Sequence, residues 1–330
     1  MQLGWKPVFI SREHHRGHGL DRHGFFATKT GFRCFNACMN QRPPVSQPKA
    51  FSSSAAKGMR CATSLAIVLS LFATVAHAEP SGVATSALED MTWFELRDQI
   101  QAGKTIAIVP IGGTEQNGPF MALGKHNVRV NVLARRIAER LGNAIVAPVI
   151  AYVPEGSYAP PTAHMKFPGT LTVPEDVFEK TLFSVGQSLR LHGFLNVVFL
   201  GDHGGYKKSV QRAAAQLNKA WAGSSTRAIV PDAYYESSSE GFNALLRASG
   251  HRNDEIGTHA ALADTALQLA VAPETVRVQQ LHGNAKGMAP GPAQGVYGGD
   301  PRRATAAMGQ PGIEAIVANT VAAIRQKTSP

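Results

Sequence analysis

The sequence predicts a three-layer α/β fold, in which helices cover both faces of a mostly parallel sheet. From Glu79 onward, short apolar runs alternate with helical patterns, which is typical of βαβ units. Two of these runs, 105–111 and 196–200, are almost entirely apolar, as expected for strands buried on both faces. A polar, glycine-rich segment follows each run. Because ligands bind beyond the carboxyl ends of such strands, we expect the two segments to share one site.

The first half of the domain follows this alternation closely. A helix is expected over 93–101, ahead of the first strand. A second helix is expected over 127–141, because apolar residues recur there at four-residue spacing and a glycine follows. The next apolar run predicts a strand over 144–153. A further helix begins at Pro174, since proline and the acidic residues after it suit a first turn, and ends at Gly193.

The second half continues in the same way. A helix is expected over 207–221 and a strand over 228–234. The remaining expected elements are helices over 241–248 and 260–271, a long ordered loop rich in glycine and proline over 282–311, and an amphipathic helix over 313–324. Since no internal repeat is found, residues 79–330 are predicted to form a single domain.

The N-terminal part of the chain has the features of a leader. Met59 and Arg60 precede a mostly apolar stretch that ends in Ala76-His77-Ala78, the pattern of a signal peptide over 59–78. The stretch is shorter than the roughly 18–20 residues that a membrane anchor requires. We therefore expect cleavage after Ala78 and export to the periplasm. Residues 1–58 are interpreted as an upstream extension that is not native, or as a disordered leader.

Charge and cysteine content exclude several classes of function. The formal net charge is +10, but residues 1–78 hold ten of the 33 Lys and Arg and only two of the 23 Asp and Glu. The rest is nearly neutral, so it has no basic surface for nucleic acid and no polybasic membrane patch. All three cysteines lie in the leader, at positions 34, 38 and 61. The domain therefore has no disulfide framework and no cysteine nucleophile or ligand.

Histidine and carboxylate side chains remain as the groups that could carry chemistry. Glu115 follows the run 105–111, and Asp202 and His203 follow the run 196–200. Metals such as zinc and manganese take imidazole and carboxylate ligands and leave a position open for water. Bound zinc lowers the pKa of that water to about 7, which makes hydroxide available at neutral pH.

Each candidate residue also has a simpler structural interpretation. Glu115 could cap the turn after its strand, and His126 could lie at an ordinary helix start as a capping residue. Asp202 either orients a ligand or forms a turn. His164 either contacts substrate or lies in a solvated loop. The glycines over 112–118 match neither G-x-G-x-x-G nor a P-loop, so no nucleotide site is predicted.

Five short motifs, in their order along the chain, resemble those of the creatininase (creatinine amidohydrolase) family. They are Gly-Thr-Glu-Gln-Asn-Gly-Pro at 113–119, Phe-Pro-Gly-Thr at 167–170, His-Gly-Phe at 192–194, Gly-Asp-His-Gly-Gly at 201–205 and His-Ala-Ala-Leu-Ala-Asp-Thr at 259–265. The resemblance covers roughly Trp93 to the C-terminus. It implies a metal-dependent amidohydrolase with a three-layer α/β fold, often hexameric, and the leader would place this chain in an exported subgroup.

The resemblance also implies roles for individual residues. Glu115 matches the glutamate ligand of the metal and His203 matches the histidine ligand. Asp264 matches a late glutamate of the family and is one methylene shorter. His259 matches the catalytic histidine.

Three positions depart from the family pattern. Asn117 stands where a histidine is usual, His126 where an aspartate bridges two metals, and Gly205 where creatininase itself has a second carboxylate ligand. These departures remove much of what would hold a second cation. Glu115, His126, His203 and Asp264 can still form one four-ligand set, so we expect one tight divalent metal site, alone or with a weak second one. Zinc is the first choice, with manganese or iron next.

The sequence thus predicts a metal-dependent hydrolase that cleaves a C–N bond of a small amide or cyclic amide with metal-activated water. His259 and Asp202 are the predicted catalytic residues, with His259 moving a proton to the leaving nitrogen. The predicted substrate-binding residues are Asn117, His164, Gly204 and Gly205. A homo-oligomer, hexameric by resemblance, is expected, without stable membrane insertion after cleavage. The alternative is a non-catalytic periplasmic protein that binds metal or ligand on the same scaffold.

Overall fold

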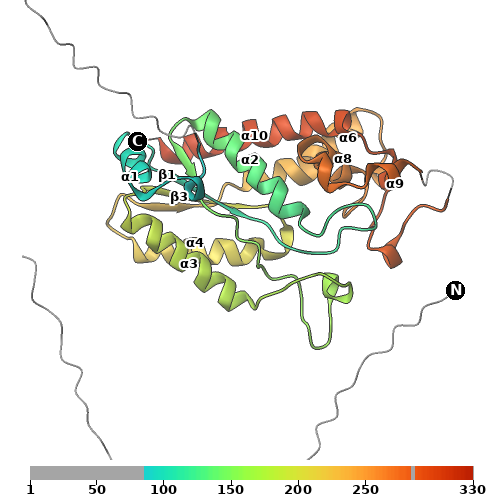
Figure 1. Cartoon of the computed structure of the whole chain (residues 1–330), viewed down its shortest axis with the longest axis horizontal. Helices are drawn as coiled ribbons and strands as arrows, with labels where there is room; N and C mark the ends of the chain where they lie inside the picture. The colour runs from blue at the N-terminus through green and yellow to red at the C-terminus, as the bar shows by residue number, and fades with distance from the viewer. Residues whose placement is uncertain (1–84, 284–286, 330) are drawn as a thin grey trace, which may run out of the picture. The chain divides into compact units, whose positions relative to one another are not determined.

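In the computed structural model, which describes residues 85–283 and 287–329, four parallel strands form one sheet in the order β2-β1-β3-β4 (Figure 1). The strands are β1 (Ile106–Ile111), β2 (Ala144–Val146), β3 (Asn196–Gly201) and β4 (Arg227–Ile229). The central pair, β1 and β3, is in register from Ile106 opposite Asn196 to Ile111 opposite Gly201. Because both strands end at the same level, the segments that follow them leave the sheet side by side.

Helices cover both faces of the sheet, as the sequence predicts (Figure 1). Strand side chains alternate between the two faces. Ile106 and Ile108 of β1 belong to the core formed with α2 (Lys125–Leu141), α8 (Leu262–Val271) and α10 (Ala306–Thr328). Ala107 and Val109 belong to the core formed with α3 (Glu175–Leu191) and α4 (Lys207–Ala220), which α1 (Trp93–Gln101) extends.

Shorter helical segments complete the described part of the chain. The α-helices are α5 (Asp232–Glu236), α6 (Phe242–Ala248), α7 (Asn253–Ile256) and α9 (Val278–Gly283), and a π-helical turn, Ser237–Gly241, joins α5 to α6. Short 3₁₀ helices lie at Leu88–Asp90, Ala163–Lys166, Gly204–Tyr206, Pro273–Thr275, Pro292–Gln294 and Pro301–Arg303.

Two strand predictions were too long. The strand predicted over 144–153 ends at Val146, and the strand predicted over 228–234 ends at Ile229. Pro231 directly precedes α5, which Asp232 opens with an acidic residue in its first turn. Apolar character beyond the strand ends therefore reflects burial in loops and helices rather than pairing in the sheet.

The prediction of a loop over 282–311 was wrong at the C-terminal end of that segment. Helix α10 begins at Ala306, where the Thr305 side chain accepts a hydrogen bond from the backbone N–H of Met308. A Cβ on Gly309 would lie 2.0 Å from the carbonyl oxygen of Ala266 in α8. Glycine in this segment therefore permits close contact between two helices, whereas the composition suggested a loop.

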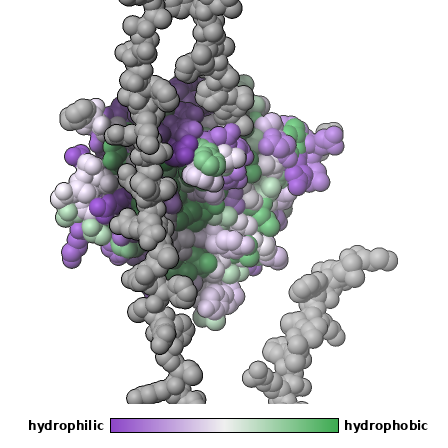
Figure 2. Space-filling model, turned by 60° about the vertical axis from the view of Figure 1, so that its left-hand side comes forward, coloured by the Kyte–Doolittle hydropathy of each residue, from purple (hydrophilic) through white to green (hydrophobic). Residues whose placement is uncertain are grey.

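The predictions for residues 1–58 and 59–78 lie outside the described residues. Among the helices of the described ranges, none has both the length and the apolar character needed to cross a membrane. Figure 2 shows both hydrophilic and hydrophobic residues on one face of the described part.

The core on the α3 side of the sheet allows a matched test of burial. Leu182 of α3 is fully buried, whereas Leu191, at the end of the same helix, is 80% exposed. We expect Leu182→Ala to lower the free energy of unfolding by about 2–5 kcal/mol, through lost burial and a residual cavity. Leu191→Ala should change it by less than about 0.5 kcal/mol. Urea unfolding of both variants measures the difference, and equal effects would contradict the described core.

Candidate metal centre

The segments after β1 and β3 form one site, and the Tyr206 hydroxyl ties them together. This hydroxyl accepts hydrogen bonds from the backbone N–H groups of Asp202 and His203, each at 3.1 Å. It lies 2.8 Å from the carbonyl oxygen of Ile111 and 2.7 Å from that of Gly112, to which it can donate. Because Tyr206 is buried, these contacts fix both strand ends relative to each other.

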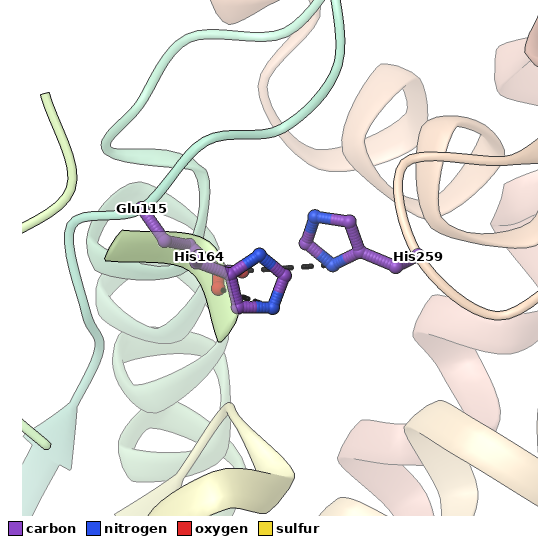
Figure 3. Close-up of side chains that lie close together, drawn as sticks. All are labelled: Glu115, His164 and His259. Carbon is purple, nitrogen blue, oxygen red and sulfur yellow. Dashed lines mark ion pairs between the residues drawn. The ribbon is translucent and has the colours of Figure 1, made fainter. Parts of the chain in front are cut away.

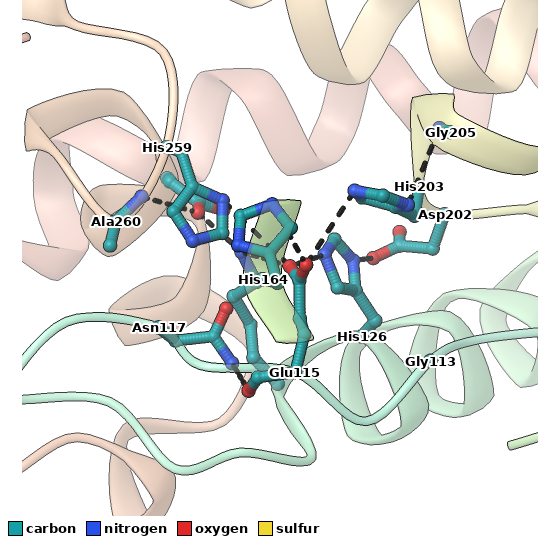
Figure 4. Close-up of polar contacts among 12 residues, drawn as sticks. Gly113, Glu115, Asn117, His126, His164, Asp202, His203, Gly205, His259 and Ala260 are labelled. Carbon is teal, nitrogen blue, oxygen red and sulfur yellow. Dashed lines mark hydrogen bonds and ion pairs between the residues drawn. The ribbon is translucent and has the colours of Figure 1, made fainter. Parts of the chain in front are cut away.

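The centre of the site is the fully buried carboxylate of Glu115, which four histidines surround (Figure 4). His126 Nε2 lies 2.9 Å from Oε1 and His259 Nδ1 lies 3.8 Å from the same oxygen. His164 Nε2 lies 3.3 Å and His203 Nε2 3.6 Å from Oε2 (Figure 3 shows His164 and His259). Oε2 has no hydrogen-bond partner among the described residues.

Each histidine has its second ring nitrogen held by another group. The four contacts are His126 Nδ1 with Asp202 Oδ2 at 2.5 Å, His164 Nδ1 with Gln116 Nε2 at 3.0 Å, His203 Nδ1 with the N–H of Gly205 at 3.3 Å, and His259 Nε2 with the carbonyl oxygen of Gln116 at 3.0 Å. His126 and His259 can donate from the second nitrogen to an oxygen, as histidines that bind metals do, whereas His164 and His203 accept there from N–H groups. The rings are therefore fixed with one nitrogen directed at Glu115.

These side chains fit a divalent cation. In the part of the chain that the structure describes, two groups of three residues could hold a metal ion, and Glu115 belongs to both. One group adds His126 and His203, the other His164 and His259, and within each group the ligand atoms lie within 4.8 Å of one another. A carboxylate with imidazoles is a donor set that zinc, manganese and iron accept. A cation would also satisfy the buried Oε2 of Glu115.

The protonation states agree with metal binding. Burial lowers the pKa of His203 to about 3 and that of His259 to about 4, so both rings are neutral at pH 7, the form that binds metals. Burial alone would raise the pKa of Glu115. The hydrogen bond and charge of His126 and the charge of Lys125 outweigh it, and the pKa of Glu115 is lowered.

A buried ion-pair network lies beside the histidines and accounts for Asp264. The Arg129 guanidinium bonds Asp202 through Nη2 at 2.8 Å and Asp264 through Nη1 at 2.8 Å. The Lys125 ammonium also pairs with Asp264 and lies 3.7 Å from Glu115 Oε1. Despite burial, these charges lower the pKa of both aspartates.

The structure brings together most of the predicted site residues. Asp264 instead lies against Lys125 and Arg129, outside both groups of potential ligands. Asp202 orients His126 rather than His203. The amide nitrogen of Asn117 donates to the carbonyl oxygens of Glu115 at 3.0 Å and Ala122 at 2.9 Å, which stabilises its own loop.

Two glycines after β3 leave space for side chains around them. A Cβ on Gly205 would lie 2.8 Å from His203 Cε1, and a Cβ on Gly204 would lie 2.3 Å from the Tyr235 hydroxyl oxygen. Larger residues at these positions would therefore displace His203 or Tyr235.

Lys125, Arg129 and Glu155 are not among the site residues that the sequence predicts. Helix α2 begins at Lys125, two residues before the predicted start, so Lys125 and Arg129 face the site together with His126. The three-residue spacing of His126 and Arg129 on one helix was a usable signal. Glu155 had no comparable signal, because it lies in a long irregular segment. Burial and then the charge of Glu115 raise the pKa of Glu155 to about 9.

The fold and site define an α/β protein with a buried carboxylate–histidine centre at the carboxyl ends of two adjacent parallel strands. The chain belongs to the creatininase family (creatinine amidohydrolase), whose sequence profile matches residues 89–324. This confirms the family resemblance seen in the sequence motifs.

Several hydrolases are similar to this chain. A mycofactocin precursor peptide peptidase of Mycolicibacterium smegmatis is 27% identical over 243 residues, which cover 70% of this chain and 85% of that protein. A creatinine amidohydrolase of Pseudomonas putida is 24% identical over 199 residues, covering 58% and 74%. A 3-dehydro-scyllo-inosose hydrolase of Thermotoga maritima is 29% identical over 126 residues, covering 38% and 37%.

Solved creatininase structures share the fold. A crystal structure of creatinine amidohydrolase has a TM-score of 0.62 at 22% identity, and the match covers 75% of this chain and all of that one. A structure described as "Creatininase Mn" has a TM-score of 0.61 at 21% identity and covers 74% of this chain and all of that one. The α/β architecture of the described residues is therefore that of creatininase.

The ion-pair network makes a prediction about stability. Arg129→Met would leave Asp202 and Asp264 buried with one guanidinium fewer, so we expect a loss of about 3–5 kcal/mol in the free energy of unfolding. Arg140→Met, on the same helix, removes only an exposed pair with Glu314 and should cost about 0–1 kcal/mol. Urea unfolding in the presence of a chelator measures both. A loss at Arg129 no larger than at Arg140 would contradict the described network.

Proposed function

We propose that this protein is a metal-dependent hydrolase that cleaves a C–N bond of a small amide or cyclic amide. One divalent cation would be held tightly by Glu115, His126 and His203. The single observation that carries the proposal is the buried Glu115 carboxylate, ringed by imidazole nitrogens and left with an oxygen that no described hydrogen-bond donor satisfies. A bound divalent cation would acidify a water molecule so that hydroxide is available near neutral pH.

The choice of Glu115, His126 and His203 for the tight site rests on burial and orientation. Glu115 and His126 are buried, and His126 is directed by the Asp202 carboxylate, an arrangement frequent among histidines that bind metals. Zinc is the proposed metal, with manganese or iron as substitutes. Creatininase structures described as "Zn-Zn type" and as "Creatininase Mn" support a metal of this kind.

The other residues of the site would bind substrate and move protons. His259, neutral at pH 7 and 3.8 Å from Glu115, would take a proton from the attacking water and deliver it to the leaving nitrogen. His164, whose ring centroid lies 4.4 Å from that of His259, would contact the substrate on the same side. Asp202 would act through His126, and Asp264 through Lys125, by holding those side chains in place.

The proposed bond type is supported by the names of two relatives. Creatinine amidohydrolase and mycofactocin precursor peptide peptidase are both named for hydrolysis at an amide-type C–N bond. The substrate panel should therefore contain lactams, small linear amides and short peptides. Export to the periplasm and assembly into a homo-oligomer are parts of the same proposal, based on the leader over 59–78 and on the family resemblance.

One test of this function concerns metal content. Purified protein should hold about one tightly bound divalent metal ion per chain, by elemental analysis after dialysis. Glu115→Gln and His203→Ala should each reduce this content severely, because each removes a ligand from the proposed set. Two tightly held equivalents per chain would contradict the single-site proposal, and none at all would contradict metal dependence.

Another test separates the enzyme from a binding protein. His259→Ala should lower kcat on the best substrate of the panel by about 10²- to 10⁴-fold while the metal content stays at the wild-type value. The Leu191→Ala variant, changed at an exposed position, should keep wild-type kcat. Tight ligand binding without turnover in the wild-type protein would instead favour a non-catalytic metal- or ligand-binding protein on this scaffold.

A further inference from the structure

Glu155 is a buried acid whose carboxylate oxygens have no hydrogen-bond partner among the described residues. The residue is only 4% exposed, and this burial includes both carboxylate oxygens. Its backbone, by contrast, is anchored, since its N–H donates to Thr172 Oγ1 at 3.0 Å. Burial of polar oxygens without hydrogen bonds is costly, so a ligand bound at this position would stabilise the side chain.

The local structure places this carboxylate at the metal centre. Oε2 of Glu155 lies 3.7 Å from Nδ1 of His203. Its Oε1 occupies space beside Gly113, where an added Cβ would lie only 2.6 Å away. Gly113 has φ +143°, a conformation that favours glycine. The segment after β1 therefore leaves room for Glu155 beside the Glu115 and His203 side chains.

The cations of the site are engaged elsewhere. Arg129 pairs with Asp202 and Asp264, and Lys125 pairs with Asp264. Among the described residues, Oε2 of Glu115 and both carboxylate oxygens of Glu155 are buried without a hydrogen-bond partner. One divalent cation bound by both side chains would give these oxygens a partner.

We propose that Glu155 is a further ligand of the metal, sharing one cation with Glu115. The inference rests on the proposed function, because it requires the cation to bind at Glu115. It adds an acidic ligand from the segment between β2 and α3, which neither the motifs nor the family positions identify. The cation then joins three segments of the chain, which follow β1, β2 and β3.

The test compares Glu155→Gln with wild type and with Glu179→Gln. Glu155→Gln keeps the size of the side chain and removes an acidic ligand. Glu179 of α3 pairs with Arg212 of α4 at 2.6 Å, and Glu179→Gln serves as the control. We expect Glu155→Gln to bind Zn²⁺ at least roughly 10- to 100-fold more weakly in competition with a chelator. Its visible absorption spectrum with Co²⁺ should also change, because a ligand is lost. Glu179→Gln should match wild type in both measurements.

A structure of the wild-type protein soaked with Zn²⁺ provides a second test that is independent of variant folding. A Glu155 oxygen at about 2.0–2.2 Å from the ion would support the proposal. An ion bound at Glu115 with Glu155 out of contact would overturn it, as would a Glu155→Gln variant with wild-type affinity and spectrum. Either result leaves the proposed hydrolase intact. A wild-type protein that binds no divalent cation would instead overturn the proposed function itself.

Discussion

The site depends on one constraint, which is that the carboxylate of Glu115 is charged and fully buried. Water cannot solvate this charge, so the protein surrounds it with Lys125 and with imidazole nitrogens. The surrounding groups come from α2, from the segment after β3 and from two loops, and each ring is held by a second contact. The burial of one acid thus explains why residues more than a hundred positions apart in the chain converge here.

Arg129 and Lys125 connect this centre to the rest of the fold. Both lie in the first turns of α2, and their partners follow β3 and lie at the start of α8. These ion pairs join the sheet to helices on one of its faces. They also separate two roles for aspartate: Asp202 orients a histidine, while Asp264 neutralises cations.

The sequence predicted features that depend on local pattern. The strands around 105–111 and 196–200, the helices that cover them and the meeting of Glu115 with His203 all follow from periodicity and from strand order. The structure differed from these predictions where packing between distant segments determines the position of a side chain. Asp264 matches a ligand position of the family motif, but its side chain pairs with Arg129. Glu155 reaches the site from an irregular segment that has no periodic sequence pattern. The spacing of residues along the chain carries no information about contacts between distant segments such as these.

The glycines of α10 affect the position of His259. Gly309 allows α10 to press against the backbone of α8 at Ala266, two residues beyond Asp264, and Gly312 allows close packing on Phe242 and Leu267. The loop that carries His259 leads directly into α8. The separation of His259 from Glu115 and His203 therefore depends on how closely the C-terminal helix α10 packs on α8. A larger residue at Gly309 would therefore shift His259 relative to Glu115 without itself belonging to the site.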